Sequence, residues 1–394
     1  MASGMVVATT RAVRAVLACA FAVSANAAQA TDEQARDIMN EIVAALQVVL
    51  PLSLDGARFD DPTNRERIHA ALRQLAANSE RLGAHDPHGG TGDTGYAFLS
   101  RSLASDARDV ERRYAQGRIS EARFLLHHVT EVCVACHSTL PDNEVRTIGR
   151  RLMADEAIAA LPVAERIQFE MATRQFDAAT ASFELLFAAP DSSPADLDRT
   201  GFYETYLELC LRVRENPDRA IATLQKLERR KDVPERMRGN LASWIASLRE
   251  LRESSDVEPS LPRARALIAQ AEDRERFSDD REALIPFIAA SGLLHRIVAS
   301  QTDDRSERGE AYYLLGVVES NIGRSFWASQ TEEFLTAAIR IGPGEPYAEA
   351  AYALLEEFVV ASFTGSAGEN VPSEIRRSLQ QLRASIDAAR TGTP

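Results

Sequence analysis

The sequence predicts an all-α protein, and three observations support this. Alanine, leucine, glutamate and arginine are abundant, and all four residue types favour helices. The alternation of β-branched and polar residues that is typical of strands is almost absent. Apolar residues recur instead at spacings of three and four through most of the 394 residues. The predicted architecture is a four-helix bundle followed by a domain of helical hairpins.

Residues 1–30 are predicted to be a secretory signal peptide rather than part of the fold. Arg11 and Arg14 precede an apolar run from Ala15 to Val23, and Ala28-Gln29-Ala30 supplies small residues for cleavage. No twin-arginine pair is present, so we expect export as an unfolded chain and a periplasmic location.

The net charge of the chain limits the kinds of partner that it is expected to bind. The formal net charge is −13 at pH 7, and loss of the two leader arginines would make it −15. So acidic a protein is not expected to bind nucleic acid, whereas a protein partner with a basic surface would be attracted to it. After the leader, no apolar run reaches the roughly 18 residues of a membrane span. We therefore expect a soluble mature protein with no membrane span.

Four helices are expected between residues 31 and 141. The first begins at the capping box Thr31-Asp32-Glu33-Gln34 and ends at Pro51. The second opens with Asp61 as its cap and Pro62 in its first turn. A glycine-rich loop that contains His85 and His88 follows it. A metal site at these two histidines is a weaker interpretation than a solvated loop.

The third and fourth helices of this region have equally specific boundaries. The third is expected to stop at Gly117, a residue that readily ends helices. The fourth is expected to start with Ser120 as its cap, with Ile119 and Phe124 forming a hydrophobic staple across its first turn. Pro141 closes the segment.

The motif with the most specific chemistry is Cys133-Val134-Ala135-Cys136-His137. Cys-x-x-Cys-His is the spacing that attaches a c-type haem, two thiols forming thioethers and the histidine ligating the iron. On a helix the three side chains share one face. With four cysteines and seven histidines, the motif would arise by chance in roughly one such chain in a thousand.

Three other interpretations of the two cysteines are weaker. A structural zinc site needs four ligands, and the remaining cysteine after the leader, Cys210, is distant in sequence. A redox dithiol accompanies a βαβ pattern, which the sequence lacks. A plain disulfide is the third of these interpretations. Cys210 lies in an apolar stretch and is expected to be a buried thiol.

The helix order and the position of this motif resemble the cytochrome c prime family over residues 31–141. Members are periplasmic four-helix bundles with Cys-x-x-Cys-His late in the fourth helix. The resemblance implies that Cys133 and Cys136 form the thioethers and that His137 is the proximal iron ligand. Family members usually carry an aromatic and a basic residue three and four places after this histidine, where Leu140 and Pro141 stand here.

The same resemblance makes Met39 the candidate for the sixth iron ligand. Family members that transfer electrons use a methionine early in the first helix, whereas gas-binding members place an apolar side chain there. Met39 is the only methionine in the bundle region and lies on the apolar stripe of its helix. The alternative is that Met39 only packs against the haem ring.

The C-terminal part is a continuous helical pattern broken at prolines. Tyr312-Tyr313-Leu314-Leu315-Gly316, followed by Leu335 and Pro343, resembles a tetratricopeptide repeat. The resemblance implies a helical-repeat domain over about residues 155–390; the alternative is an all-α domain without repeats. No nucleophile elbow, phosphate loop or HExxH motif is present in this half, so the chain is not expected to be an enzyme.

Taken with the resemblances, these features predict a periplasmic monohaem c-type cytochrome. One covalent haem c per chain would transfer electrons, and the helical repeats would dock a redox partner protein. A haem-based gas or redox sensor with an open sixth site is the first alternative, and a haem-free helical-repeat adaptor is the second. Dimerisation through bundle helices is common in the resembled family, but no residue commits this chain to a homodimer.

Overall fold

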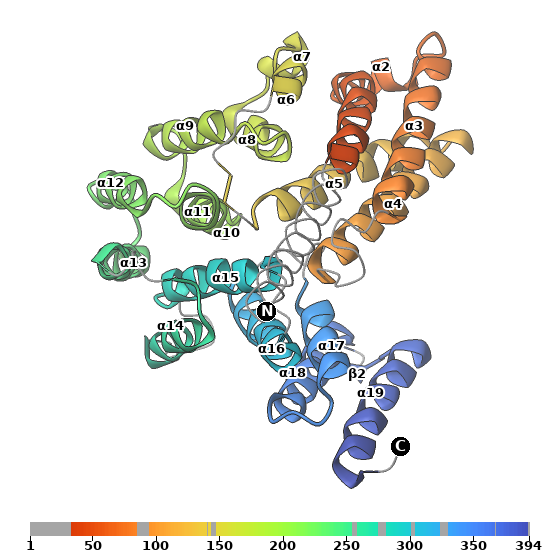
Figure 1. Cartoon of the computed structure of the whole chain (residues 1–394). Coiled ribbons are helices and arrows are strands. Elements are labelled where there is room, and N and C mark those ends of the chain that lie inside the picture. Colours follow the sequence, from red (N-terminus) through yellow and green to blue (C-terminus); the bar gives the residue numbers. More distant parts are fainter. Residues whose placement is uncertain are drawn as a thin grey trace, which may run out of the picture. The chain divides into compact units, whose positions relative to one another are not determined.

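The described part of the computed structural model is almost entirely helical (Figure 1). It covers residues 33–84, 94–139, 141–142, 147–253, 258–274, 281–300, 304–323, 330–366 and 368–392. Its strands are β1 (Thr364–Gly365) and β2 (Gly368–Glu369), which form one short antiparallel hairpin. The predicted all-α class is confirmed. The predicted leader, His85 and His88 lie outside the described residues.

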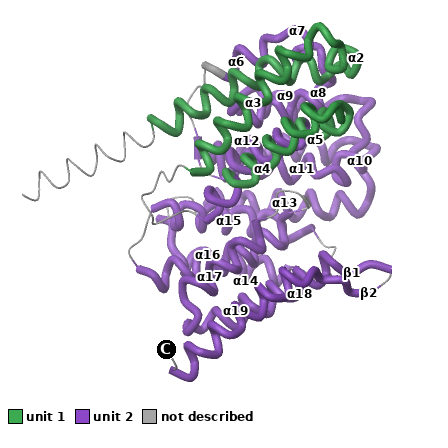
Figure 2. Tube along the Cα trace, turned by 90° about the vertical axis from the view of Figure 1, so that its right-hand side faces the viewer, with its two compact units in different colours: residues 1–92, 100–126 green, residues 93–99, 127–394 purple. Residues whose placement is uncertain are grey.

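The chain divides into two compact units (Figure 2). The first contains residues 1–92 and 100–126, and the second contains residues 93–99 and 127–394. The division lies inside helix α5 (Ile119–His137), before its cysteines. The predicted domains, 31–141 and 155–390, therefore do not coincide with these units and stay predictions.

The first unit is built from antiparallel helices. They are a helix over residues 33–53, α2 (Gly56–Asp60), α3 (Arg65–Ala84), most of α4 (Thr94–Ala115) and the start of α5. Arg81 near the end of α3 contacts Glu41 near the start of the first helix, 2.5 Å apart. Gly83 lies against Ser100 and Ala104 of α4. The core consists of buried apolar residues at helical spacing, among them Ile38, Ile42, Leu46, Ile68, Leu72, Leu75, Leu103, Ala107, Val110, Ala122 and Leu126.

Four of the predicted details in this unit are wrong. The first helix continues through Pro51 to residue 53, because burial of the adjacent Leu50 and Leu52 offsets the hydrogen bond that the proline removes. Asp61 accepts from the Thr63 backbone in a turn, and α3 begins at Arg65, later than predicted. Ser120 is not the cap of the fourth helix, because α5 already begins at Ile119. The predicted staple does not form, since Phe124 is 63% exposed. Gly117 does end the third helix, with φ at 77°.

The second unit continues α5 with a succession of helices. They are α6 (Thr147–Met153), α7 (Glu156–Ala159), α8 (Val163–Ala172), α9 (Phe176–Ala188), α10 (Pro194–Arg199), α11 (Phe202–Glu208), the π-helical turn η1 (Leu209–Val213), α12 (Pro217–Glu228), α13 (Glu235–Glu253), α14 (Leu261–Arg274), α15 (Leu284–Ala299), α16 (Arg305–Ile322), α17 (Thr331–Ile341), α18 (Tyr347–Ser362) and α19 (Ser373–Thr391). Consecutive helices pack against each other in α8 with α9, α12 with α13, and from α14 to α18. The predicted helical hairpins are therefore present.

The prolines of this unit lie where the sequence predicts breaks. Pro217 occupies the first position of α12, and Pro234 immediately precedes α13. Pro262 and Pro286 lie within the first three residues of their helices. A first-turn amide has no intrahelical acceptor, so a proline there costs no hydrogen bond.

A glycine sets the spacing between α16 and α17. A Cβ atom added to Gly316 would overlap with Cδ2 of Leu335, because the two atoms would be closer than van der Waals contact allows. In contrast, a Cβ atom at Gly239 of α13 would meet nothing within 4 Å. The two helical glycines therefore separate the steric effect of a methyl group from its effect on helix propensity.

We expect Gly316→Ala to lower the free energy of unfolding by about 1 to 3 kcal/mol, because the methyl group overpacks the interface. Gly239→Ala is the matched control and should raise it by up to about 1 kcal/mol, since alanine favours helix over glycine. Urea unfolding followed by circular dichroism measures both. Equal effects of the two substitutions would contradict the close approach.

Candidate functional site

The Cys-x-x-Cys-His motif occupies the last two turns of α5. Cys133, Cys136 and His137 are all half-buried, and His137 is the last helical residue. Because each residue advances about 100° around a helix, the three side chains lie within about 100° of one another. No disulfide joins the cysteines of the described chain. The structure therefore brings these three predicted site residues together on one face.

The environment of Cys133 argues against a redox dithiol. Its Sγ donates to the Val129 carbonyl at 3.4 Å. Burial, and to a smaller extent the neighbouring Cys136, raise the pKa of Cys133 to about 12. Reactive dithiols depend on a lowered thiol pKa. In the haem-free chain, Cys133 is therefore a neutral thiol at neutral pH.

The described residues do not supply the ligands of a structural zinc site. Its histidine, cysteine and acidic side chains form no group of three or more that would hold a metal ion. Cys210 is 1% exposed in η1, as an apolar thiol was predicted to be. Burial raises its pKa to about 12.

The segment after the motif is anchored to the second unit. Asp142 is buried, and its carboxylate accepts from Nε of Arg174 at 2.6 Å. The Asp142 backbone donates to the Val213 carbonyl and accepts from Arg214. Thr130, one turn before the cysteines, accepts from Gln168 of α8 at 2.6 Å. These contacts hold the motif-bearing end of α5 in a fixed place on the helical hairpins.

Met39 lies in the other compact unit. It is half-buried in the helix over residues 33–53, between the fully buried Ile38 and Ile42. Met39 is thus more exposed than the two isoleucines of the inward stripe to which it was predicted to belong. Its role as a ligand stays a prediction.

The remaining described histidines of interest have acidic neighbours. Nε2 of His69 lies 2.8 Å from Glu111, between α3 and α4, which fits the structural role predicted for this residue. Nε2 of His295 lies 3.6 Å from Glu319 in the core of the second unit.

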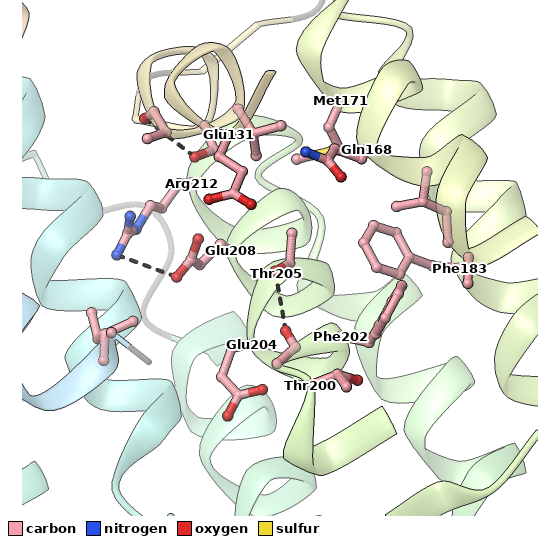
Figure 3. Close-up of a pocket in the computed structure, with 18 of the residues that line it drawn as sticks. Glu131, Gln168, Met171, Phe183, Thr200, Phe202, Glu204, Thr205, Glu208 and Arg212 are labelled. Atoms are coloured by element: carbon pink, nitrogen blue, oxygen red, sulfur yellow. Dashed lines mark hydrogen bonds and ion pairs between the residues drawn. The ribbon is translucent and has the colours of Figure 1, made fainter. Parts of the chain in front are cut away.

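The opposite face of α5 lines a pocket of about 490 Å³ in the second unit (Figure 3). Glu131, Val134, Ala135 and Ser138 contribute from α5. The other walls come from α8 to α11, η1, α16 and Gln330. Sequence reasoning missed this pocket.

The pocket has an apolar side and a charged side (Figure 3). Phe183 and Phe202 pack edge to face on the apolar side, with ring centroids 6.0 Å apart. Glu131, Glu208 and Arg212 contribute to the charged side. Burial raises the pKa of Glu208; the Arg212 charge opposes this shift and the Glu319 charge adds to it.

Two buried ion pairs contribute to the charged side. Nη2 of Arg212 lies 3.0 Å from Glu319, and the Ser291 hydroxyl donates to the same carboxylate at 2.5 Å. A second pair joins Arg281 to Glu204 at 2.8 Å. Burial alone would raise the pKa of Glu319. The Arg212 charge and hydrogen bonds outweigh it and hold the pKa at about 2.

A π-helical turn shapes this wall. The turn η1 continues α11 and carries Arg212. Single π-helical turns are rare and are frequent at functional sites. A sequence feature that points to the pocket is the four-residue spacing of Glu204, Glu208 and Arg212, which places three charges on one face of an otherwise apolar segment.

Comparison with known proteins adds no information on the chemistry of this site. No protein-family model, curated protein or solved structure matches the chain. Of the helices in the described part of the chain, none combines the length and the apolar character that crossing a membrane requires.

The Arg212 and Glu319 pair should make stability depend on acidity. Because the folded pKa of Glu319 is below its usual 4.5, the pair stabilises the protein above about pH 4.5, and this contribution is lost as pH falls toward 2. We expect Glu319→Gln to cost about 3 kcal/mol at pH 7, since it leaves a buried cation uncompensated. The cost should shrink below pH 4.5. Urea unfolding at several pH values measures it.

Glu250→Gln is the control, because it removes an exposed carboxylate that pairs with the half-buried Arg274. Such surface pairs contribute about 0 to 1 kcal/mol. A cost for Glu319→Gln as small as that of Glu250→Gln would contradict the importance of the buried pair.

Proposed function

We propose that the chain is a periplasmic monohaem c-type cytochrome that transfers electrons. Cys133 and Cys136 would bind one haem c covalently, and His137 would ligate its iron. The observation that carries this proposal is the grouping of these three residues on one face at the end of α5, without a disulfide. The haem, when bound, supplies an iron that takes up and gives up one electron.

The chain itself would contribute attachment and rigidity. In this proposal the two thiols would hold one flat group, and the adjacent imidazole would ligate its iron. The Asp142 contacts with Arg174 and Arg214 restrain the end of the segment. A fixed ligand limits reorganisation when the charge on a metal changes, and its surroundings tune the potential.

The helical hairpins of the second unit support a docking role. Consecutive packed helices, as in α14 to α18, are the building plan of repeat domains that bind protein partners. The net charge of −13 favours a redox partner with a basic surface. The resemblances to the cytochrome c prime family and to tetratricopeptide repeats are part of this proposal.

Covalent attachment of haem can be tested by haem staining of a denaturing gel and by counting the cysteine thiols that remain free. After expression with periplasmic haem attachment, we expect the mature chain to keep haem stain on a denaturing gel. In urea, only Cys210 should then react with iodoacetamide, because Cys133 and Cys136 would be thioethers. Peptide mass spectrometry identifies the alkylated residues.

A Cys133→Ala, Cys136→Ala double variant is the control and should lose the stain while Cys210 still reacts. A wild-type chain without stain, in which all three thiols react after reduction, would overturn the proposal. The haem-free adaptor would then be the better interpretation.

The sixth ligand is tested by substitution of Met39. If its thioether ligates the iron, the wild-type protein should have a low-spin ferrous absorption spectrum that carbon monoxide does not change. The Met39→Ala variant should have a spectrum that shifts when carbon monoxide is added. Met153→Ala is the control, since Met153 is also half-buried but lies in α6. A Met39→Ala spectrum identical to the wild type would remove Met39 as a ligand. A wild-type spectrum that already shifts with the gas would favour the sensor.

A further inference from the structure

The pocket beside α5 has more negative than positive charge available to a ligand. Arg212 lies 3.0 Å from Glu319 but 4.0 Å from Glu208, so its charge mainly compensates Glu319. Glu204 is already paired with Arg281. Glu208 is therefore less well compensated than Glu319 and Glu204.

Glu131 adds a second carboxylate on the same side. It comes from α5 and lines the pocket with Glu208 (Figure 3). Its ion-pair contact is Nδ1 of His128 at 3.4 Å, an imidazole that carries charge only when protonated. Two carboxylates at one cavity wall favour a cationic ligand, since unpaired charge is costly to bury.

Gln330 supplies an independent indication of a ligand. This residue is 8% exposed and lines the pocket, and its side-chain oxygen has no hydrogen-bond partner within the described chain. A buried acceptor without a donor costs about 1 to 3 kcal/mol. A ligand with N–H donors would remove this cost.

The size and the apolar side define the rest of the ligand. A volume of about 490 Å³ lies within the range of sites for small organic molecules. Phe183 and Phe202 offer aromatic surface to an apolar group. A bare metal ion would not use this surface, and the described residues contain no cluster suited to a metal.

We propose that this pocket binds a primary amine carried on an apolar body. The ammonium group lies at Glu208 and Glu131, and an N–H donor of the ligand satisfies the Gln330 oxygen. The apolar body packs against the aromatic pair. This inference does not depend on haem, because the pocket lies on the face of α5 opposite to Cys133 and His137.

The test is calorimetric titration of the full mature protein at pH 8 with 2-phenylethylamine as the probe. The neutral analogue 3-phenyl-1-propanol has similar size and an aromatic ring but no charge. We expect the amine to bind at least tenfold more tightly than the alcohol. Equal binding of the two probes, or no binding of the amine, would overturn the proposal without any variant.

Substitution then locates the cation. Glu208→Gln keeps the shape of the side chain and should weaken amine binding about tenfold, with alcohol binding unchanged. Glu374→Gln removes an exposed carboxylate from the first turn of α19 and should change neither. Full-strength amine binding by the Glu208→Gln variant would overturn the assignment.

The double cysteine variant separates this inference from the proposed function. We expect the Cys133→Ala, Cys136→Ala protein to bind 2-phenylethylamine with wild-type affinity. Loss of amine binding in a folded double variant would overturn the independence of the pocket. Loss of haem stain alone leaves the pocket intact.

Discussion

The geometry of a single helix constrains the site more than any other feature. Because residues advance about 100° per step, the i, i+3, i+4 spacing of Cys133, Cys136 and His137 commits one face of α5 to the motif. The opposite face is left for Glu131 and Ser138, which line the pocket. One helix thus presents two chemically distinct surfaces, and a change in its rotation would displace both.

This rotation is fixed by polar contacts that are distant in sequence. Thr130 bonds to Gln168, and Asp142 is held by Arg174 and by the backbone around Val213. Buried polar groups are costly unless they are paired, so these contacts define one orientation rather than several. The η1 turn belongs to the same arrangement, since it contains Val213 and carries Arg212 beside the pocket.

The fold could be predicted further than the site. Helix breaks at Pro217 and Pro234 and the end of α4 at Gly117 follow from local backbone chemistry, and they lie where expected. The predicted helix end at Pro51 was wrong because burial of Leu50 and Leu52 outweighs the local effect of the proline. The predicted staple at Phe124 was wrong because a staple needs an apolar surface to pack against, and the residue pattern alone does not establish one.

By itself, the sequence determined the helical class, most breaks and the shared face of Cys133, Cys136 and His137. These depend on residues a few positions apart, where propensity and periodicity act. Only the tertiary structure decided that Arg212 meets Glu319 and that Gly316 meets Leu335. It also decided that Glu208 lies at a cavity wall instead of in solvent. Burial and charge pairing arise between segments far apart in the chain, so no local pattern encodes them.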